Sequence, residues 1–187
     1  MSGPAPIVLA STSPQRSAIL AQLGIPFEVV APPYEEEDGG DPVEHAAGKA
    51  RSVDGGDRPV LGVDTIVRCE GQVIGKPRDA GEAERMLELL AGRTHEVVSG
   101  LCLRIPAWEE LHSETTRVTF RELTPRDLAH YLRSGEWEGR AGAYAIQGLG
   151  ASLVESVEGD YLNVVGLPGA LLVRLLAERF AGAYGFG

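Results

Sequence analysis

The sequence predicts an α/β fold in which a mixed sheet is flanked by helices. Short apolar runs alternate with amphipathic segments along the 187 residues, which is typical of strands and helices in alternation. Two long strand-like runs, 95–105 and 111–123, flank a turn near Pro106 and indicate antiparallel pairing. Mixed pairing favours the α/β class over a strict βαβ array. The length suits a single domain over residues 1–187, with one lobe or two.

The first elements are a strand, a helix and a second strand. Residues 5–10 and 26–31 are short apolar runs. Between them, Ser13 is an expected N-cap and Pro14 an expected first helical residue, and glycine follows the end of the segment 14–23. The sequence therefore predicts a helix over 14–23, entered directly from the first strand.

Two more helices flank a hairpin. Asp41 followed by Pro42 predicts the start of the second helix. Residues 58–75 form an apolar strand that runs into a hairpin turned at Glu70-Gly71. Asp79 then marks the start of a third helix, whose apolar residues recur at helical spacing until Gly92.

The second half of the chain begins with the two long strands. Thr124-Pro125 predicts a helix that ends near Ser134. Residues 139–168 are rich in glycine and predict a packed loop with one strand at 151–157. The last helix is expected over 168–181, because four leucines lie on one face.

Composition excludes several classes of function. The net charge of −10 argues against wrapping of nucleic acid. Two isolated cysteines and four scattered histidines form neither a disulfide framework nor a zinc motif. No segment approaches a membrane span and no targeting signal is evident, so a soluble cytoplasmic protein is the expectation. Complete P-loop, nucleophile-elbow and dinucleotide-binding motifs are absent.

The junction "VLASTSPQRSAIL" carries more polar groups than a helix cap needs. A phosphate at this helix start would accept hydrogen bonds from backbone N–H groups, from the hydroxyls of Ser11 and Ser13 and from Arg16. The alternative is that Ser13 only caps the helix and Arg16 is solvated. From these residues alone, both interpretations stay open.

Asp64 is the strongest candidate for chemistry. It lies inside the apolar run "VLGVDTIV", where a carboxylate is costly unless it is paired or bound to a metal. The acidic run 35–38 is expected to be a solvated loop, although one carboxylate could turn inward to bind a hard cation. Lys76 follows the hairpin and could reach a phosphate, whereas Lys49, on a helix, has the pattern of a solvated lysine.

Six short motifs, in order, resemble the Maf family of nucleoside triphosphate pyrophosphatases: "LASTSPQR", "GKA", "GVDTIV", "GKPRDAGEAERMLELLAGRTHEV", "AYAIQGLGA" and "GDYLNVVGLP". The resemblance implies an inosine triphosphatase-like fold: a mixed, elongated sheet with flanking helices, and two lobes around a nucleotide cleft. It implies hydrolysis between the α and β phosphates, giving a nucleoside monophosphate and pyrophosphate. It also implies a divalent cation, Mg²⁺ or Mn²⁺.

The resemblance also implies roles for individual residues. The phosphate-contacting turn corresponds to Ser11, Ser13 and Arg16, the phosphate-facing lysines to Lys49 and Lys76, and the general base to Asp64. Glu36 best matches the metal-binding glutamate, with the register among Glu35, Glu36 and Glu37 open by one residue. Asp64 is a ligand of the cation, the base, or both.

Substrate choice rests on three positions. Thr65 and Gln147 match residues that select the base in relatives acting on dTTP and UTP. Gln15 replaces one of two basic residues found after Ser-Pro in pyrimidine-specific members, which removes a bidentate donor and leaves the base preference open, modified pyrimidine nucleotides included. The competing hypothesis is a nucleotide-binding regulator of cell division with incidental catalysis. A homodimer is expected from the resemblance alone.

Overall fold

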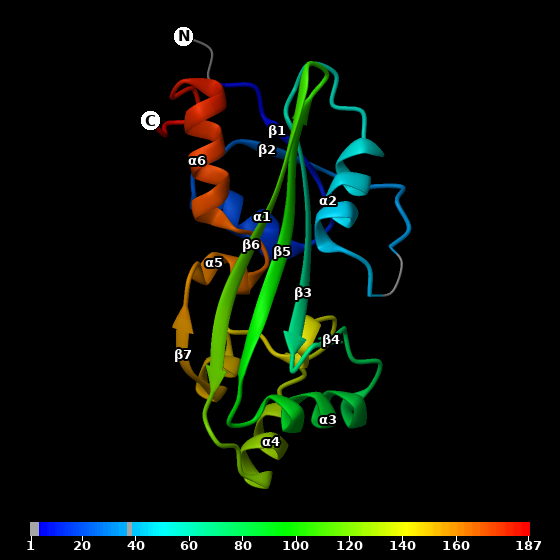
Figure 1. Ribbon diagram of the computed structural model, residues 1–187, viewed down its shortest axis with the longest axis vertical. Helices are drawn as coiled ribbons and strands as arrows, with labels where there is room; N and C mark the ends of the chain where they lie inside the picture. Colours follow the sequence, from blue (N-terminus) through cyan, green and yellow to red (C-terminus); the bar gives the residue numbers. More distant parts are fainter. Residues whose placement is uncertain (1–3, 37–38) are drawn as a thin grey trace. The chain divides into compact units, whose positions relative to one another are not determined.

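The computed structural model describes residues 4–36 and 39–187 and confirms the α/β class (Figure 1). The strands are β1 (Ile7–Ala10), β2 (Phe27–Val30), β3 (Val60–Cys69), β4 (Gln72–Ile74), β5 (Thr94–Ile105), β6 (Trp108–Phe120) and β7 (Val154–Glu158). The α-helices are α1 (Pro14–Gln22), α2 (Pro42–Arg51), α3 (Ala80–Leu90), α4 (Pro125–Leu132), α5 (Tyr161–Val165) and α6 (Gly169–Phe180).

The strands form a mixed sheet, as predicted. Its order is β2-β1-β3-β5-β6-β7, and β4 pairs with β3 outside this path. Strand β1 is parallel to both β2 and β3, whereas the β3–β4 and β6–β7 pairs are antiparallel. The two-residue turn between β5 and β6 makes that pair a hairpin. Parallel pairing through helical crossovers therefore joins the N-terminal strands.

The chain divides into two compact units, and each is described by itself. The first unit consists of Met1–Asp64, Ser99–Glu114 and Gly166–Gly187, and the second of Thr65–Val98 and Thr115–Val165. Helices α1, α2 and α6 belong to the first unit, and α3, α4 and α5 to the second. Alanines of α2 pack on β1 and β3 in the first unit, while leucines of α3 pack with aromatic residues of α4 and β6 in the second.

The expected capping residues begin three of the helices. The carboxylate of Asp41 accepts hydrogen bonds from two N–H groups of α2, and that of Asp79 accepts one from α3. Thr124 and Asp127 form a reciprocal capping box at α4. The hairpin turn between β3 and β4 has positive φ at both central residues, 50° at Glu70 and 79° at Gly71, as a type I′ turn requires.

Three elements differ from the prediction. The strand expected at 151–157 begins only at Val154, because residues 149–153 form a 3₁₀ helix. Helix α5 lies in the segment expected to be loop, and its five residues are too few for a periodic signal. Strand β6 starts at Trp108, three residues early, because the turn before it takes only two residues. Within residues 4–36 and 39–187, helices long and apolar enough to cross a membrane are absent.

Candidate active site

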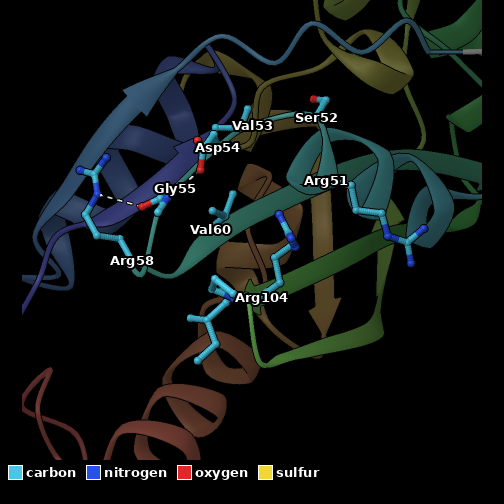
Figure 2. Close-up of a pocket in the computed structure, with 11 residues that line it drawn as sticks. Arg51, Ser52, Val53, Asp54, Gly55, Arg58, Val60 and Arg104 are labelled. Carbon is cyan, nitrogen blue, oxygen red and sulfur yellow. Dashed lines mark hydrogen bonds between the residues drawn. The ribbon is translucent and has the colours of Figure 1, made fainter.

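One pocket of the first unit is lined by none of the predicted site residues (Figure 2). Its volume is about 330 Å³, and Arg51, Arg58 and Arg104 line it together with the loop after α2. The arginines already have carboxylate partners: Arg51 and Arg104 pair with Glu109, and Arg58 pairs with Glu28. The three arginines thus share two carboxylates, and because none of the predicted site residues lines this pocket, it is not the candidate active site.

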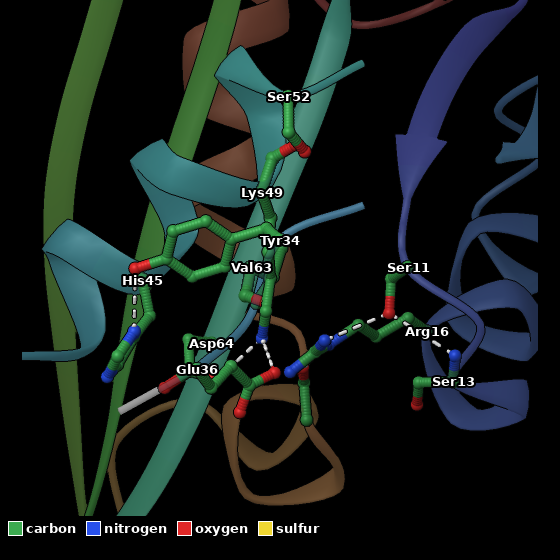
Figure 3. Close-up of polar contacts among 11 residues, drawn as sticks. Ser11, Ser13, Arg16, Tyr34, Glu36, His45, Lys49, Ser52, Val63 and Asp64 are labelled. Atoms are coloured by element: carbon green, nitrogen blue, oxygen red, sulfur yellow. Dashed lines mark hydrogen bonds and ion pairs between the residues drawn. The ribbon is translucent and has the colours of Figure 1, made fainter. Parts of the chain in front are cut away.

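The polar junction before α1 is organised around Ser11. Ser11 is 5% exposed, and its Oγ accepts hydrogen bonds from Nη1 of Arg16 (3.0 Å) and from the backbone N–H of Ser13 (3.2 Å) (Figure 3). Arg16 also donates from Nε to the carbonyl of Gly166 (3.0 Å). Ser13 occupies the N-cap position, but its side chain makes no capping bond and donates instead to Oε1 of Gln15 (3.1 Å). The Ser13 hydroxyl therefore does not act as a helix cap.

The ammonium group of Lys49 forms ion pairs with two carboxylates that come from different segments. Its Nζ lies 2.7 Å from Oδ1 of Asp64, 2.6 Å from Oε1 of Glu36 and 3.4 Å from the carbonyl oxygen of Val63 (Figure 3). Lys49 and Asp64 are 5% and 7% exposed, whereas the Glu36 side chain is 46% exposed. The interpretation of Lys49 as a solvated helix lysine is wrong, because close packing of α2 buries it.

Small residues bring α2 and β3 close enough for this contact. Gly62 and Asp64 are two residues apart on β3, so their side-chain positions share one face of the strand. A Cβ on Gly62 would lie 2.1 Å from the carbonyl oxygen of Ala46 and 2.9 Å from Cβ of Ala50, both on α2. The helix backbone therefore lies against Gly62, and Lys49 on the same helix reaches Asp64.

Electrostatics links the two clusters. Burial lowers the pKa of Arg16 below its ordinary value, and the negative charges of Asp64 and Glu36 oppose that shift. An arginine side chain stays protonated throughout the ordinary pH range, so Arg16 remains a cation. Arg16 and Lys49 thus present two positive charges in the field of the two carboxylates, a composition suited to a charged, phosphorylated ligand.

The structure describes Glu35 and Glu36 of the acidic run, and the register of the metal-binding glutamate among Glu35, Glu36 and Glu37 stays a prediction. Glu36 pairs with Lys49, and Glu35 is exposed. Glu37 and Asp38 lie outside the described residues.

Three predicted residues belong to the second unit. Thr65 follows Asp64 on β3 and is half-buried, Lys76 is exposed in the loop after β4, and Gln147 is exposed in the turn 146–148. Their roles toward a ligand stay predictions.

The carboxylate pair fits a hard divalent cation. Carboxylate oxygens are the ligands that such cations prefer, and Mg²⁺ is commonly held by one or two carboxylates together with substrate phosphates. Oδ1 of Asp64 and Oε1 of Glu36 both lie within 2.7 Å of the Lys49 ammonium, so the two carboxylate groups are close to each other. Groups of three or more metal-ligating side chains are absent from the described part of the chain.

Tyr34 and His45 are neighbours of this site that sequence reasoning missed. A hydrogen bond of 3.0 Å joins the Tyr34 hydroxyl and Nδ1 of His45, and the rings meet edge to face. The only signal in the sequence is that His45 precedes Lys49 by four residues, so both lie on one face of α2.

The fold and the site together define an α/β protein with a buried acid–lysine pair beside a helix N-terminus that also carries an arginine. The chain belongs to the Maf family: the sequence model of the Maf-like protein family matches residues 6–179.

Curated relatives cover nearly the whole chain. A dTTP/UTP pyrophosphatase of Nitratidesulfovibrio vulgaris is 47% identical over 94% of this chain and 89% of its own length. A protein of the same name from Deinococcus radiodurans is 44% identical over 97% and 95%, and one from Aquifex aeolicus is 42% identical over 92% and 94%.

Proposed function

We propose that this protein hydrolyses nucleoside triphosphates to the monophosphate and pyrophosphate, with a preference for dTTP and UTP. The observation that supports it most is the ammonium of Lys49 held between Asp64 and Glu36, because a protein that only binds nucleotide has no need of a buried base. The names of the relatives support the same reaction and favour it over a regulator of cell division. The cytoplasm, where nucleotide pools lie, is the proposed compartment.

In the proposed hydrolysis, different residues of the chain bind the phosphates, accept the proton of the water and hold the cation. Arg16, Lys49 and Lys76 offset the negative charge of the phosphates, and backbone N–H groups at the start of α1 donate hydrogen bonds to one phosphate. Asp64 takes a proton from the attacking water. The water oxygen bonds to phosphorus while the α–β anhydride bond breaks, and pyrophosphate leaves. A divalent cation held by Glu36 and Asp64 would neutralise phosphate charge and polarise the anhydride.

The choice of base is proposed to rest on Thr65, Gln147 and Gln15. Gln15 already accepts a hydrogen bond from Ser13, so this neutral amide is held at the phosphate-binding turn. A panel of natural and modified triphosphates, assayed for pyrophosphate release with and without Mg²⁺ or Mn²⁺, tests the substrate and the metal together. Tight binding without hydrolysis of any triphosphate would support the regulator instead. We also propose a homodimer, which light scattering can test.

The first variant is Asp64→Asn. It should reduce pyrophosphate release by at least about 10³-fold, because the amide cannot accept the water proton, while circular dichroism shows a folded chain. Near-normal turnover would refute the assignment of the base.

Glu36→Gln and Glu35→Gln form a matched pair of substitutions. The two residues are adjacent, but only Glu36 pairs with Lys49 among the described contacts. Glu36→Gln should raise the cation concentration needed for half-maximal activity, and Glu35→Gln should not. Equal effects would show that the loop contributes only general negative charge.

A further inference from the structure

The second pair of residues at this site, Tyr34 and His45, holds the acidic segment against α2. Tyr34 precedes Glu36 by two residues, and His45 precedes Lys49 by four, which places His45 one turn away on the same helix face. The segment 31–36 thus meets α2 at two places: through the Tyr34–His45 hydrogen bond of 3.0 Å and through the Glu36–Lys49 ion pair of 2.6 Å (Figure 3).

Glycine makes room for this arrangement on α2. A Cβ on Gly48 would lie 2.2 Å from Cε2 of the Tyr34 ring, so the ring lies directly on the helix backbone. Glycine is otherwise unfavourable inside a helix, and here the space it leaves is filled by Tyr34.

A second glycine contacts the other partner. A Cβ on Gly40 would lie 2.2 Å from Nε2 of His45, so the backbone of Gly40 lies against the His45 ring. His45 is 6% exposed, which means that its ring has a fixed position from which to hold Tyr34.

The ion pair of Glu36 needs such support. The Glu36 side chain is 46% exposed, and exposed ion pairs alone contribute little to holding two segments together. The contacts of Tyr34 with the buried His45 and with Gly48 can fix the backbone two residues away and so reduce the freedom that Glu36 loses when it reaches Lys49.

We propose that Tyr34 and His45 are positioning residues that hold Glu36 at Lys49 and Asp64. The inference rests on the proposed function, because Tyr34 and His45 would hold Glu36 at the proposed cation and phosphate site. Tyr34 and His45 take no part in proton transfer; they act through Glu36.

The first experiment is a double-mutant cycle between Tyr34→Phe and Glu36→Gln, measured as kcat for pyrophosphate release at limiting cation. A neutral hydrogen bond changes an equilibrium by about fivefold, so Tyr34→Phe should lower the rate by up to about fivefold. In the Glu36→Gln background the same change should have no further effect, because the residue that it positions is already lost. Additive effects would overturn the proposal.

His45 supplies a test by rescue. His45→Leu should lower the rate at least as much as Tyr34→Phe. His45→Asn, whose amide can replace Nδ1 toward Tyr34, should recover at least half of the loss. Equal rates for the two variants would show that His45 only fills space.

Gly48→Ala separates positioning from stability. Alanine should stabilise the helix, yet its Cβ must displace the Tyr34 ring. We expect the gain in helix propensity to offset most of the cost of displacing the ring, so that Tm changes little while the rate falls by about tenfold. Gly81→Ala in α3 is the matched control, because a Cβ there meets nothing closer than 3.4 Å, and its rate should equal that of the native protein. A native rate for Gly48→Ala would overturn the proposal.

A readout without catalysis keeps this inference distinct from the proposed function. In metal-free buffer, Tyr34→Phe should increase cleavage after Glu35 or Glu36 by a glutamate-specific protease several-fold, because the segment detaches more often. Equal cleavage rates would contradict the positioning role even if no triphosphate were a substrate. Inactive native protein with increased cleavage in the variant would refute the proposed function and leave the positioning role standing.

Discussion

Removal of the Lys49 ammonium tests the central ion pair. Lys49→Met keeps the length of the side chain and leaves Asp64, 7% exposed, without its partner at 2.7 Å. Breaking a buried pair by removing one partner costs roughly 3–5 kcal/mol. Most of this cost comes from Asp64, since Glu36 is half-exposed and can turn to water. For a chain of this size, we expect Tm to fall by roughly 6–20 °C.

The assay is urea unfolding followed by circular dichroism. The transition midpoint should fall without a change in slope. The matched variant is the double change Lys49→Met with Asp64→Asn, which removes the unpaired charge and should regain at least half of the lost free energy of unfolding. A double variant no more stable than Lys49→Met would refute the reasoning, because the loss would then come from packing and not from the buried carboxylate.

Two further predictions concern the buried His95 and the close packing at Gly62. Burial lowers the pKa of His95 from 6.5 to about 4. Between these two pH values the unfolded chain therefore binds more protons than the folded chain. The free energy of unfolding should fall as pH is lowered from 6.5 to 4, by up to about 3 kcal/mol. His95→Gln should remove that part of the pH dependence in urea midpoints, and an unchanged slope below pH 6.5 would contradict it. Gly62→Ala places a Cβ 2.1 Å from the Ala46 carbonyl oxygen; it should cost about 1–3 kcal/mol and also lower kcat by moving Lys49 from Asp64. A kcat equal to that of the native protein would contradict the second effect.

The elements with local signals could be predicted from the sequence. Asp41, Asp79 and Thr124 cap helices where expected, since a cap depends on a side chain and on amides two or three residues away. The turn at Glu70-Gly71 was likewise set by neighbouring residues. The short helix α5 and the 3₁₀ segment 149–153 were missed, because elements of five residues carry no periodicity and depend on what packs around them.

The features of the candidate site likewise fall into those that the sequence could predict and those that it could not. By itself, the sequence determined that Asp64 lies in an apolar strand and that hydroxyls and Arg16 gather at a helix start, because both are patterns within a few residues. Only the tertiary structure decided that Lys49 is buried, that it joins Asp64 to Glu36, and that Tyr34 lies on Gly48. These contacts join residues 13 to 15 positions apart through the packing of α2 on β3 and on the acidic segment. Whether a side chain reaches another element depends on how closely the two backbones approach, which residues far apart in the sequence decide together. Gly62 allows α2 to lie close to β3, and Gly48 allows the Tyr34 ring to lie on α2.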